Sequence, residues 1–136
     1  MATYAPPATD DKKPIRSFRD LKVWEKAFWL AVDVHRLTER FAADIPAGLP
    51  SGMRESSVAL ATHIAQGHTH SYLKDFLRCL DLSLAALSDL ETRVLLAGAL
   101  DYLQRGECAE IEARICEVRR MEWGLVNRLR AREGST

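Results

Sequence analysis

The sequence predicts an all-α protein, an antiparallel up-down-up-down four-helix bundle. Three observations support this prediction. Apolar residues recur at helical spacing in four stretches of the 136-residue chain, short links join those stretches, and no stretch shows the alternation expected of a strand. Short links place consecutive helices side by side in opposite directions, so a simple bundle is the expected arrangement.

The N-terminal residues 1–16 contain several prolines among small and charged residues. Such a composition can bury little apolar surface, so we expect a flexible tail. Ser17 predicts a helix cap, with Asp20 three residues later in the place of the usual Glu of a capping box. The bundle is expected over residues 17–132, followed by a short C-terminal tail at 133–136.

The first helix is expected to run to about Ala43, and its apolar residues form two neighbouring stripes. Together the stripes cover roughly 200°, although an arc of about 100° is enough for one core contact. Half of the arc therefore needs a second partner, either another helix of the same domain or a second subunit. The first stripe is Val23, Ala27, Leu30, Val34, Leu37 and Phe41, and the second is Leu21, Trp24, Phe28, Ala31 and His35.

Trp29 projects onto the polar side of the same helix. An exposed Trp is often the anchor of a protein contact. The alternative is a ring that lies along the stems of neighbouring Lys and Arg side chains. Trp24, Phe28 and Trp29 are therefore the candidate interface residues.

Three further helices complete the predicted bundle. They are expected at Ser51–Gln66 with Gly67 as C-cap, at Tyr72–Leu100 with Ser71 as N-cap, and at Glu107–Arg132. The first of the three is rich in Ser and Ala, which let neighbouring helices approach closely. The apolar stripe of the last is interrupted by Glu122.

The Tyr72–Leu100 helix is rich in leucine and contains no Pro, and Glu91 projects into the middle of its expected leucine face. That face consists of Leu73, Leu80, Leu84, Leu87 and Leu95. A buried carboxylate needs a partner, so Glu91 is predicted to be a structural buried charge. The expected partners are the N-terminal end of the Ser51–Gln66 helix and Arg54, with Arg119 or Arg120 as the alternative.

Bulk composition excludes several classes of protein. The chain has 19 Lys and Arg residues and 19 Asp and Glu residues. It therefore lacks the excess positive charge that is typical of a non-specific nucleic-acid binder. The odd number of cysteines, without CxxC spacing, indicates reduced thiols, and no apolar run approaches the about 20 residues of a membrane span. We expect a cytoplasmic protein that does not enter a membrane.

Catalytic and metal-binding motifs are not evident. His63, His68, His70 and Cys79 offer zinc-type ligands, but their spacing matches no recognised site, so solvated or helix-end histidines are the preferred interpretation. The sequence has no GxSxG, Walker loop or HExxH motif, and it lacks the Glu-x-x-His pairs of a di-iron bundle. We therefore expect no enzyme and no cofactor.

A series of segments in a fixed order resembles one family. The segments are FRDLKVWEKA, HIAQG, DFLRCL, LSDLET and RMEWGLVNRL, and the resemblance covers about residues 18–129. The family comprises the four-helix-bundle proteins encoded in 23S ribosomal RNA intervening sequences, which are similar to the accessory variability protein of diversity-generating retroelements. Membership would imply a ring of five bundles; it implies no enzymatic chemistry, and no activity is established for the intervening-sequence branch. For the retroelement branch it would also imply binding to a reverse transcriptase and to nucleic acid.

Departures from the family pattern weaken the nucleic-acid prediction. Glu55 follows Arg54 where the family usually has two arginines, and the link after Gly67 has histidines where basic residues are common. Arg54, Lys74 and Arg78 still match basic family positions and are the candidate nucleic-acid residues. The sequence and the resemblance together favour an oligomeric, five-membered scaffold or adaptor for a reverse transcriptase with RNA or DNA. The alternative is a purely structural homo-oligomer.

Overall fold

The computed structural model describes residues 14–70 and 72–134, and within these residues it contains helices and no strand. The elements are a short 3-10 helix η1 (Phe18–Asp20) and four α-helices: α1 (Lys22–Glu39), α2 (Gly48–Thr69), α3 (Leu73–Ala99) and α4 (Arg105–Gly134). The prediction of an all-α, four-helix protein is confirmed.

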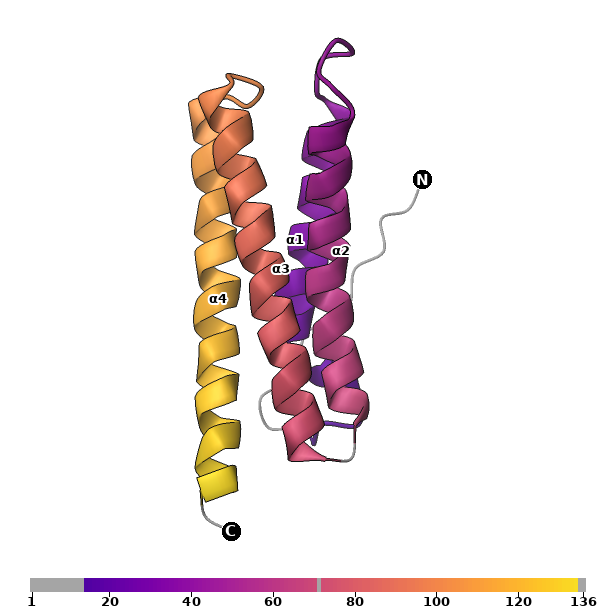
Figure 1. The fold of residues 1–136 in the computed structure, drawn as a ribbon, viewed down its shortest axis with the longest axis vertical. Helices are drawn as coiled ribbons and strands as arrows, with labels where there is room; N and C mark the ends of the chain where they lie inside the picture. Colours follow the sequence, from indigo (N-terminus) through magenta and orange to yellow (C-terminus); the bar gives the residue numbers. More distant parts are fainter. Residues whose placement is uncertain (1–13, 71, 135–136) are drawn as a thin grey trace.

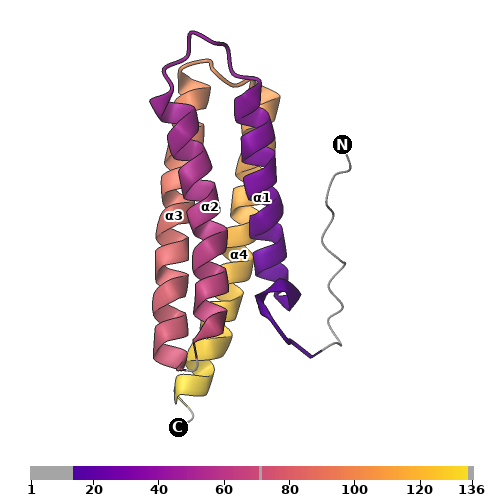
Figure 2. The ribbon, with the colours of Figure 1, turned by 90° about the vertical axis from the view of Figure 1, so that its right-hand side faces the viewer.

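The four helices lie side by side and alternate in direction (Figures 1 and 2). Helix α1 packs against α2 and α4, and α3 packs against the same two helices from the other side. The α1–α2 and α3–α4 loops lie at one end of the bundle, whereas the α2–α3 link and the C-terminus lie at the other (Figure 1). This is the predicted up-down-up-down arrangement.

The capping box of Ser17 and Asp20 forms as predicted, but it caps the short helix η1 and not α1. Ser17 Oγ accepts a hydrogen bond of 3.2 Å from the backbone N–H of Arg19, and Asp20 Oδ2 accepts from the backbone N–H of Ser17 at 3.3 Å. Leu21 then adopts an extended conformation with ψ of 121° and separates η1 from α1. The first α-helix is therefore shorter than expected and ends at Glu39 instead of Ala43. Residues 1–13 of the predicted tail lie outside the described residues.

Gly67 is not a C-cap, because α2 continues to Thr69. The residue is buried, and a Cβ placed on it would lie 2.8 Å from Phe76 Cδ1 and 3.0 Å from Cys79 Cβ. Glycine is thus needed here for close packing of α2 against α3. Ser71, the predicted cap of the next helix, lies outside the described residues, and Tyr72 precedes α3 without a side-chain cap.

The buried face of α3 differs from the predicted leucine face. Leu80 and Leu87 are fully buried, but Leu95 is 48% exposed, and the face turns toward Leu90 and Val94, which are also fully buried. The polar residues on the other side of α3 are all exposed: Lys74, Arg78, Asp81, Ser88, Asp89 and Thr92.

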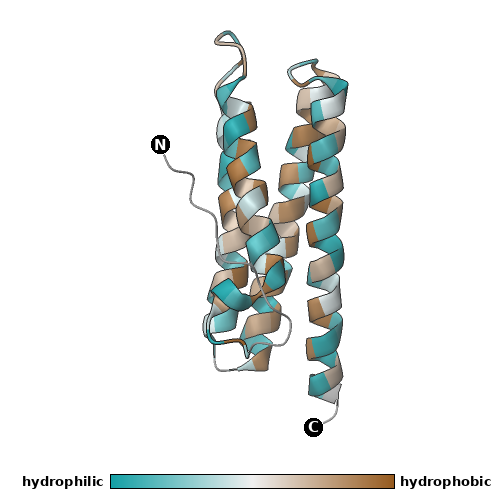
Figure 3. Ribbon diagram, turned by 180° about the vertical axis from the view of Figure 1, so that it is seen from behind, coloured by the Kyte–Doolittle hydropathy of each residue, from teal (hydrophilic) through white to brown (hydrophobic). Residues whose placement is uncertain are grey.

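The C-terminal helix is longer than expected. It begins at Arg105, after Asp101 has taken a left-handed backbone conformation with φ of 62°, and it continues to Gly134, so part of the predicted 133–136 tail is helical. Hydrophobic and hydrophilic residues alternate around the helices in Figure 3, as in amphipathic helices that share one core. Among the described helices, none is long and apolar enough to cross a bilayer.

Candidate functional site: an apolar groove between α1 and α2

The two apolar stripes of α1 have different environments. The first stripe faces the core, where Ala27, Leu30 and Val34 are at most 1% exposed. The second stripe faces the space beside α2, and four of its five members, Trp24, Phe28, Ala31 and His35, are only half-buried, whereas Leu21 is buried. The bundle therefore covers one half of the wide apolar arc and leaves the other half partly open to solvent.

An open groove of about 640 Å³ lies between α1 and α2, the two helices nearest the viewer in Figure 2. Its lining is mostly aromatic and aliphatic, and its ionisable members are Arg36 and His35. The lining residues are Phe18, Trp24, Phe28, Ala31, Val32, His35, Arg36, Val58, Ala61, Thr62, Ala65, Gln66 and Thr69. We call this surface the α1–α2 groove.

A row of aromatic rings forms the α1 wall of the groove. The ring centroids of Phe18 and Trp24 are 5.0 Å apart in an edge-on arrangement, and those of Trp24 and Phe28 are 5.3 Å apart. The α2 wall is built from small residues such as Ala61 and Ala65, which do not cover the rings. The groove is thus a preformed apolar surface with rigid aromatic anchors.

Toward the α1–α2 loop the groove becomes polar. A second hollow of about 650 Å³ shares His35 and Val58 with the groove. There Arg54 Nε donates a 2.7 Å hydrogen bond to Thr38 Oγ1, which itself donates to the Val34 carbonyl oxygen at 2.8 Å. Arg54 therefore connects α2 to α1 at this end.

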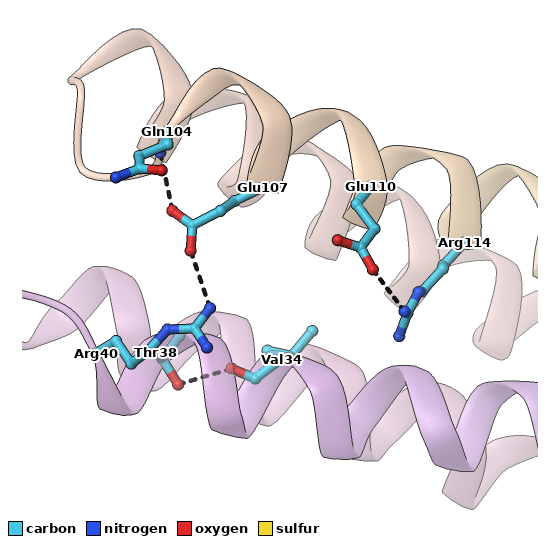
Figure 4. A network of polar contacts seen from close by, with 7 residues as sticks. All are labelled: Val34, Thr38, Arg40, Gln104, Glu107, Glu110 and Arg114. Atoms are coloured by element: carbon cyan, nitrogen blue, oxygen red, sulfur yellow. Dashed lines mark hydrogen bonds and ion pairs between the residues drawn. The ribbon is translucent and has the colours of Figure 1, made fainter.

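The opposite side of α1, toward α4, carries ion pairs. Arg40 Nη2 lies 2.9 Å from Glu107 Oε2, Lys26 Nζ lies 3.2 Å from Glu117 Oε1, and Arg114 pairs with Asp33. Figure 4 shows the end of this row, where Glu107 also accepts a hydrogen bond from the backbone N–H of Gln104. We call this side the α1–α4 seam.

Trp29 belongs to the seam and not to the groove. It lines a small hollow of about 260 Å³ with Lys26, Asp33, Arg114 and Glu117, and it is half-buried. Its ring meets Phe28 edge-on, with centroids 5.4 Å apart. This placement agrees with the alternative in which the ring lies among charged neighbours. Of the three candidate interface residues, Trp24 and Phe28 line the groove.

The three candidate nucleic-acid residues do not come together within one chain. Lys74 and Arg78 are exposed in the first two turns of α3, beside the α2–α3 link. Arg54 is fifteen residues before the end of α2 at Thr69, which at about 1.5 Å per residue places it roughly 22 Å along the bundle. Its guanidinium is already bonded to Thr38.

Glu91 pairs with the alternative partner, Arg119. Arg119 Nη2 donates a 2.9 Å hydrogen bond to Glu91 Oε1, and the two side chains are 29% and 27% exposed. The prediction that Arg54 is the partner of Glu91 is wrong, and so is the prediction that Glu91 is fully buried. Because the buried face of α3 turns toward Leu90 and Val94, Glu91 lies at the edge of that face, next to α4, and not at its centre.

The fully buried carboxylate is Glu122 of α4, which is 0% exposed. The hydroxyl of Ser83 on α3 is bonded to Glu122 Oε1, and burial raises the pKa of Glu122 to about 7, although Ser83 and Arg119 act in the opposite direction. Sequence reasoning found Glu122 only as an interruption of an apolar stripe. That interruption was the available signal, since a polar residue in a buried stripe requires an internal partner.

The histidines near the α2–α3 link make protein contacts. His63 Nδ1 lies 3.1 Å from Gln66 Oε1, and the rings of His68 and Phe76 meet edge-on with centroids 6.1 Å apart. Among residues 14–70 and 72–134, no three His, Cys, Asp or Glu side chains are placed to hold a metal ion. The three cysteines are free thiols.

The fold and its apolar surface define the class of protein, an antiparallel helical bundle with an open apolar groove on one side. The chain belongs to the family described as 23S rRNA-intervening sequence protein, which matches residues 19–124.

A solved structure of similar fold supports the architecture. It is a protein of unknown function from the S23 ribosomal protein family of Bacteroides thetaiotaomicron VPI-5482, with a TM-score of 0.70 and 15% identity, covering 76% of this chain and 97% of that one. Among curated proteins, none matches this chain.

Proposed function

We propose that this chain is a non-enzymatic scaffold that associates with copies of itself through the α1–α2 groove. The observation that supports this proposal is the second apolar stripe of α1, whose aromatic rings line an open groove of about 640 Å³. Apolar surface of this kind is typical of a protein contact site, and a small domain gains stability by covering it.

The second surface of the proposed contact is an edge of α3. Leu82, Leu96 and Leu100 are 48%, 49% and 48% exposed. Their spacing of fourteen and four residues places them along one side of the helix. A closed ring needs two different surfaces that meet head to tail, and the groove and this leucine edge supply such a pair.

The charges beside the groove and beside the leucine edge do not decide the pairing. The ionisable residues that line the groove are the cationic or neutral Arg36 and His35. On α3, Asp89 is bonded to Arg93, and the exposed Arg78 lies four residues before Leu82, so the leucine edge carries charges of both signs. A ring of five is the assembly that the family resemblance implies.

Light scattering tests this assembly. The wild-type chain is expected at about five times 15.3 kDa, and a stable monomer at micromolar concentration contradicts the proposal. Phe28→Glu in the groove and Leu96→Glu on the leucine edge should each produce monomers. Lys26→Gln in the α1–α4 seam is the matched control and should leave the mass unchanged.

Mixing the two variants tests the head-to-tail geometry. Phe28→Glu retains the leucine edge and Leu96→Glu retains the groove, so an equimolar mixture can form one intact contact and should stop at a dimer of about twice 15.3 kDa. If instead the groove contacts a second groove, Leu96→Glu alone already forms a dimer, and adding Phe28→Glu does not increase its mass.

The narrower proposal is an adaptor for a reverse transcriptase and its RNA or DNA. The exposed pair Lys74 and Arg78 supports it, because a ring would repeat that pair around one end of the bundles. The zero net charge and the separate position of Arg54 make the purely structural homo-oligomer the competing candidate.

Fluorescence anisotropy with labelled RNA, single-stranded DNA and duplex DNA at low salt separates the two candidates. The adaptor should bind weakly and without sequence preference, should lose binding steeply as salt rises, and should lose it on combined Lys74→Glu and Arg78→Glu substitution. Absence of binding to all three at micromolar protein leaves the structural homo-oligomer.

A further inference from the structure

Glu122 has an unusual environment for a glutamate. The side chain is 0% exposed, and within the described part of the chain its Oε2 atom has no hydrogen-bond partner. Oε1 is bonded to a neutral group, the hydroxyl of Ser83. An ionised carboxylate with one neutral partner and one unpartnered oxygen is costly to bury.

Ser83 touches a second acceptor. Its Oγ lies 3.0 Å from the carbonyl oxygen of Leu60 on α2, while it also contacts Glu122 Oε1 on α4. A hydroxyl has a single hydrogen to donate. If Glu122 is ionised, that hydrogen can satisfy only one of the two contacts. If Glu122 is protonated, the carboxyl group donates to Ser83 Oγ, Ser83 donates to Leu60, and both contacts become hydrogen bonds.

We propose that Glu122 is protonated in the folded bundle and donates a hydrogen bond to Ser83, which donates to the Leu60 carbonyl, so that one proton joins α4, α3 and α2. We call this chain of bonds the Glu122 relay. It also accounts for Oε2, which becomes the carbonyl oxygen of a neutral acid and costs less to leave unpartnered than a charged oxygen. Release of the proton breaks the relay and weakens the bundle.

The charged groups around Glu122 do not replace the proton. Arg119, on the same helix, attracts the ionised form, but its guanidinium is bonded to Glu91 of α3. Cys79, which is buried on α3, is a free thiol. None of the buried residues of the other three helices carries a charged side chain. These buried residues are Val23, Ala27, Leu30, Val34, Leu37 and Thr38 of α1, Gly52, Met53, Ser56, Ser57, Leu60, Ile64 and Gly67 of α2, and Cys79, Leu80, Ser83, Leu87, Leu90, Val94 and Ala97 of α3.

The direction of the pH effect follows from linkage. Burial raises the pKa of Glu122 from 4.5 to about 7, despite the opposing effects of Ser83 and Arg119. Between these two values the folded chain retains a proton that the unfolded chain has released. The contribution of Glu122 to the free energy of unfolding is therefore complete below 4.5, falls as pH rises through the window, and reaches its minimum above about 7.

A carbon-13 NMR titration of the glutamate carboxyls in the wild-type protein tests the protonation directly. The Glu122 signal, identified by its absence from Glu122→Gln or by backbone assignment, should titrate near pH 7. A midpoint at or below the ordinary value of 4.5 overturns the proposal. This measurement needs no variant to fold.

Thermal melts test the consequence. In Glu122→Gln the amide N–H can donate to Ser83 but does not titrate. From about pH 5 to about pH 8 the melting temperature of the wild type should fall by roughly 5–10 °C more than that of Glu122→Gln. Glu110→Gln, on the exposed side of α4, is the control and should follow the wild type. Parallel pH profiles for wild type and Glu122→Gln overturn the relay.

Discussion

The two sides of helix α1 differ in the kind of side chain that lies at the edge of the core. Toward α4, the edge of the core is covered by ion pairs such as Arg40 with Glu107. Toward α2, aromatic rings including Trp24 and Phe28 face small residues and remain partly open to solvent. The charged side needs no further partner, because its charged groups pair with each other.

The difference indicates where binding energy is available. Exposed ion pairs contribute about 0–1 kcal/mol each, so the α1–α4 seam orders the helices more than it stabilises them. Apolar surface contributes about 25 cal/mol for each Å² that is removed from water, so the aromatic wall of the groove can stabilise a contact that the seam cannot. Association is therefore expected on the α2 side of α1.

The largest expected effect distinguishes the two stripes of α1. Leu30, in the core stripe, is 1% exposed, and Leu30→Ala should lower the free energy of unfolding by about 2–5 kcal/mol. Phe28→Ala should cost about 1 kcal/mol when measured in the Leu96→Glu background, because the groove is then open to water. Urea unfolding gives both values. Equal losses would show that the Phe28 ring is packed within its own chain.

An intermediate effect is expected at Glu91, whose ion pair is more buried than those of the seam. Glu91→Ala should cost about 1–2 kcal/mol, less than a fully buried pair, because Arg119 and Glu91 are 29% and 27% exposed. Glu91→Gln should cost less, since an acceptor remains. A double-mutant cycle with Arg119→Ala isolates the pair, and a coupling energy of zero would contradict the contact.

The smallest effect is expected in the α1–α4 seam. Lys26 and Glu117 are 53% and 38% exposed, so Lys26→Gln should change the free energy of unfolding by less than about 0.5 kcal/mol. The difference from the wild type should vanish in about 1 M salt, where charges are screened within about 3 Å. Urea unfolding at low and high salt measures both, and a salt-independent loss would assign the effect to packing.

Local sequence patterns predicted several features of η1 and α1 correctly. Ala27, Leu30 and Val34 share one stripe and are all buried, and the Ser17 capping box forms with Asp20 as its second member. These features depend on residues within a few positions of each other, so the sequence contains all the information that they need.

Features that involve two helices were predicted less well. Gly67 was assigned to a helix end by its type, yet its role is to let Phe76 and Cys79 of α3 approach α2. Glu91 was placed at the centre of a leucine face, yet it lies at the edge beside Arg119. The helical projection of one helix shows which residues share a side but not which neighbour covers that side.

The sequence by itself determined the number of helices, their alternating order and the excess of apolar arc on α1, because each depends on local spacing and on the length of the links. Only the tertiary structure decided which stripe of that arc enters the core and which lines the groove. It also decided that Glu122, and not Glu91, is the fully buried carboxylate. The physical reason is that burial depends on the rotation of each helix about its own axis, and that rotation is set by packing against all neighbours at once.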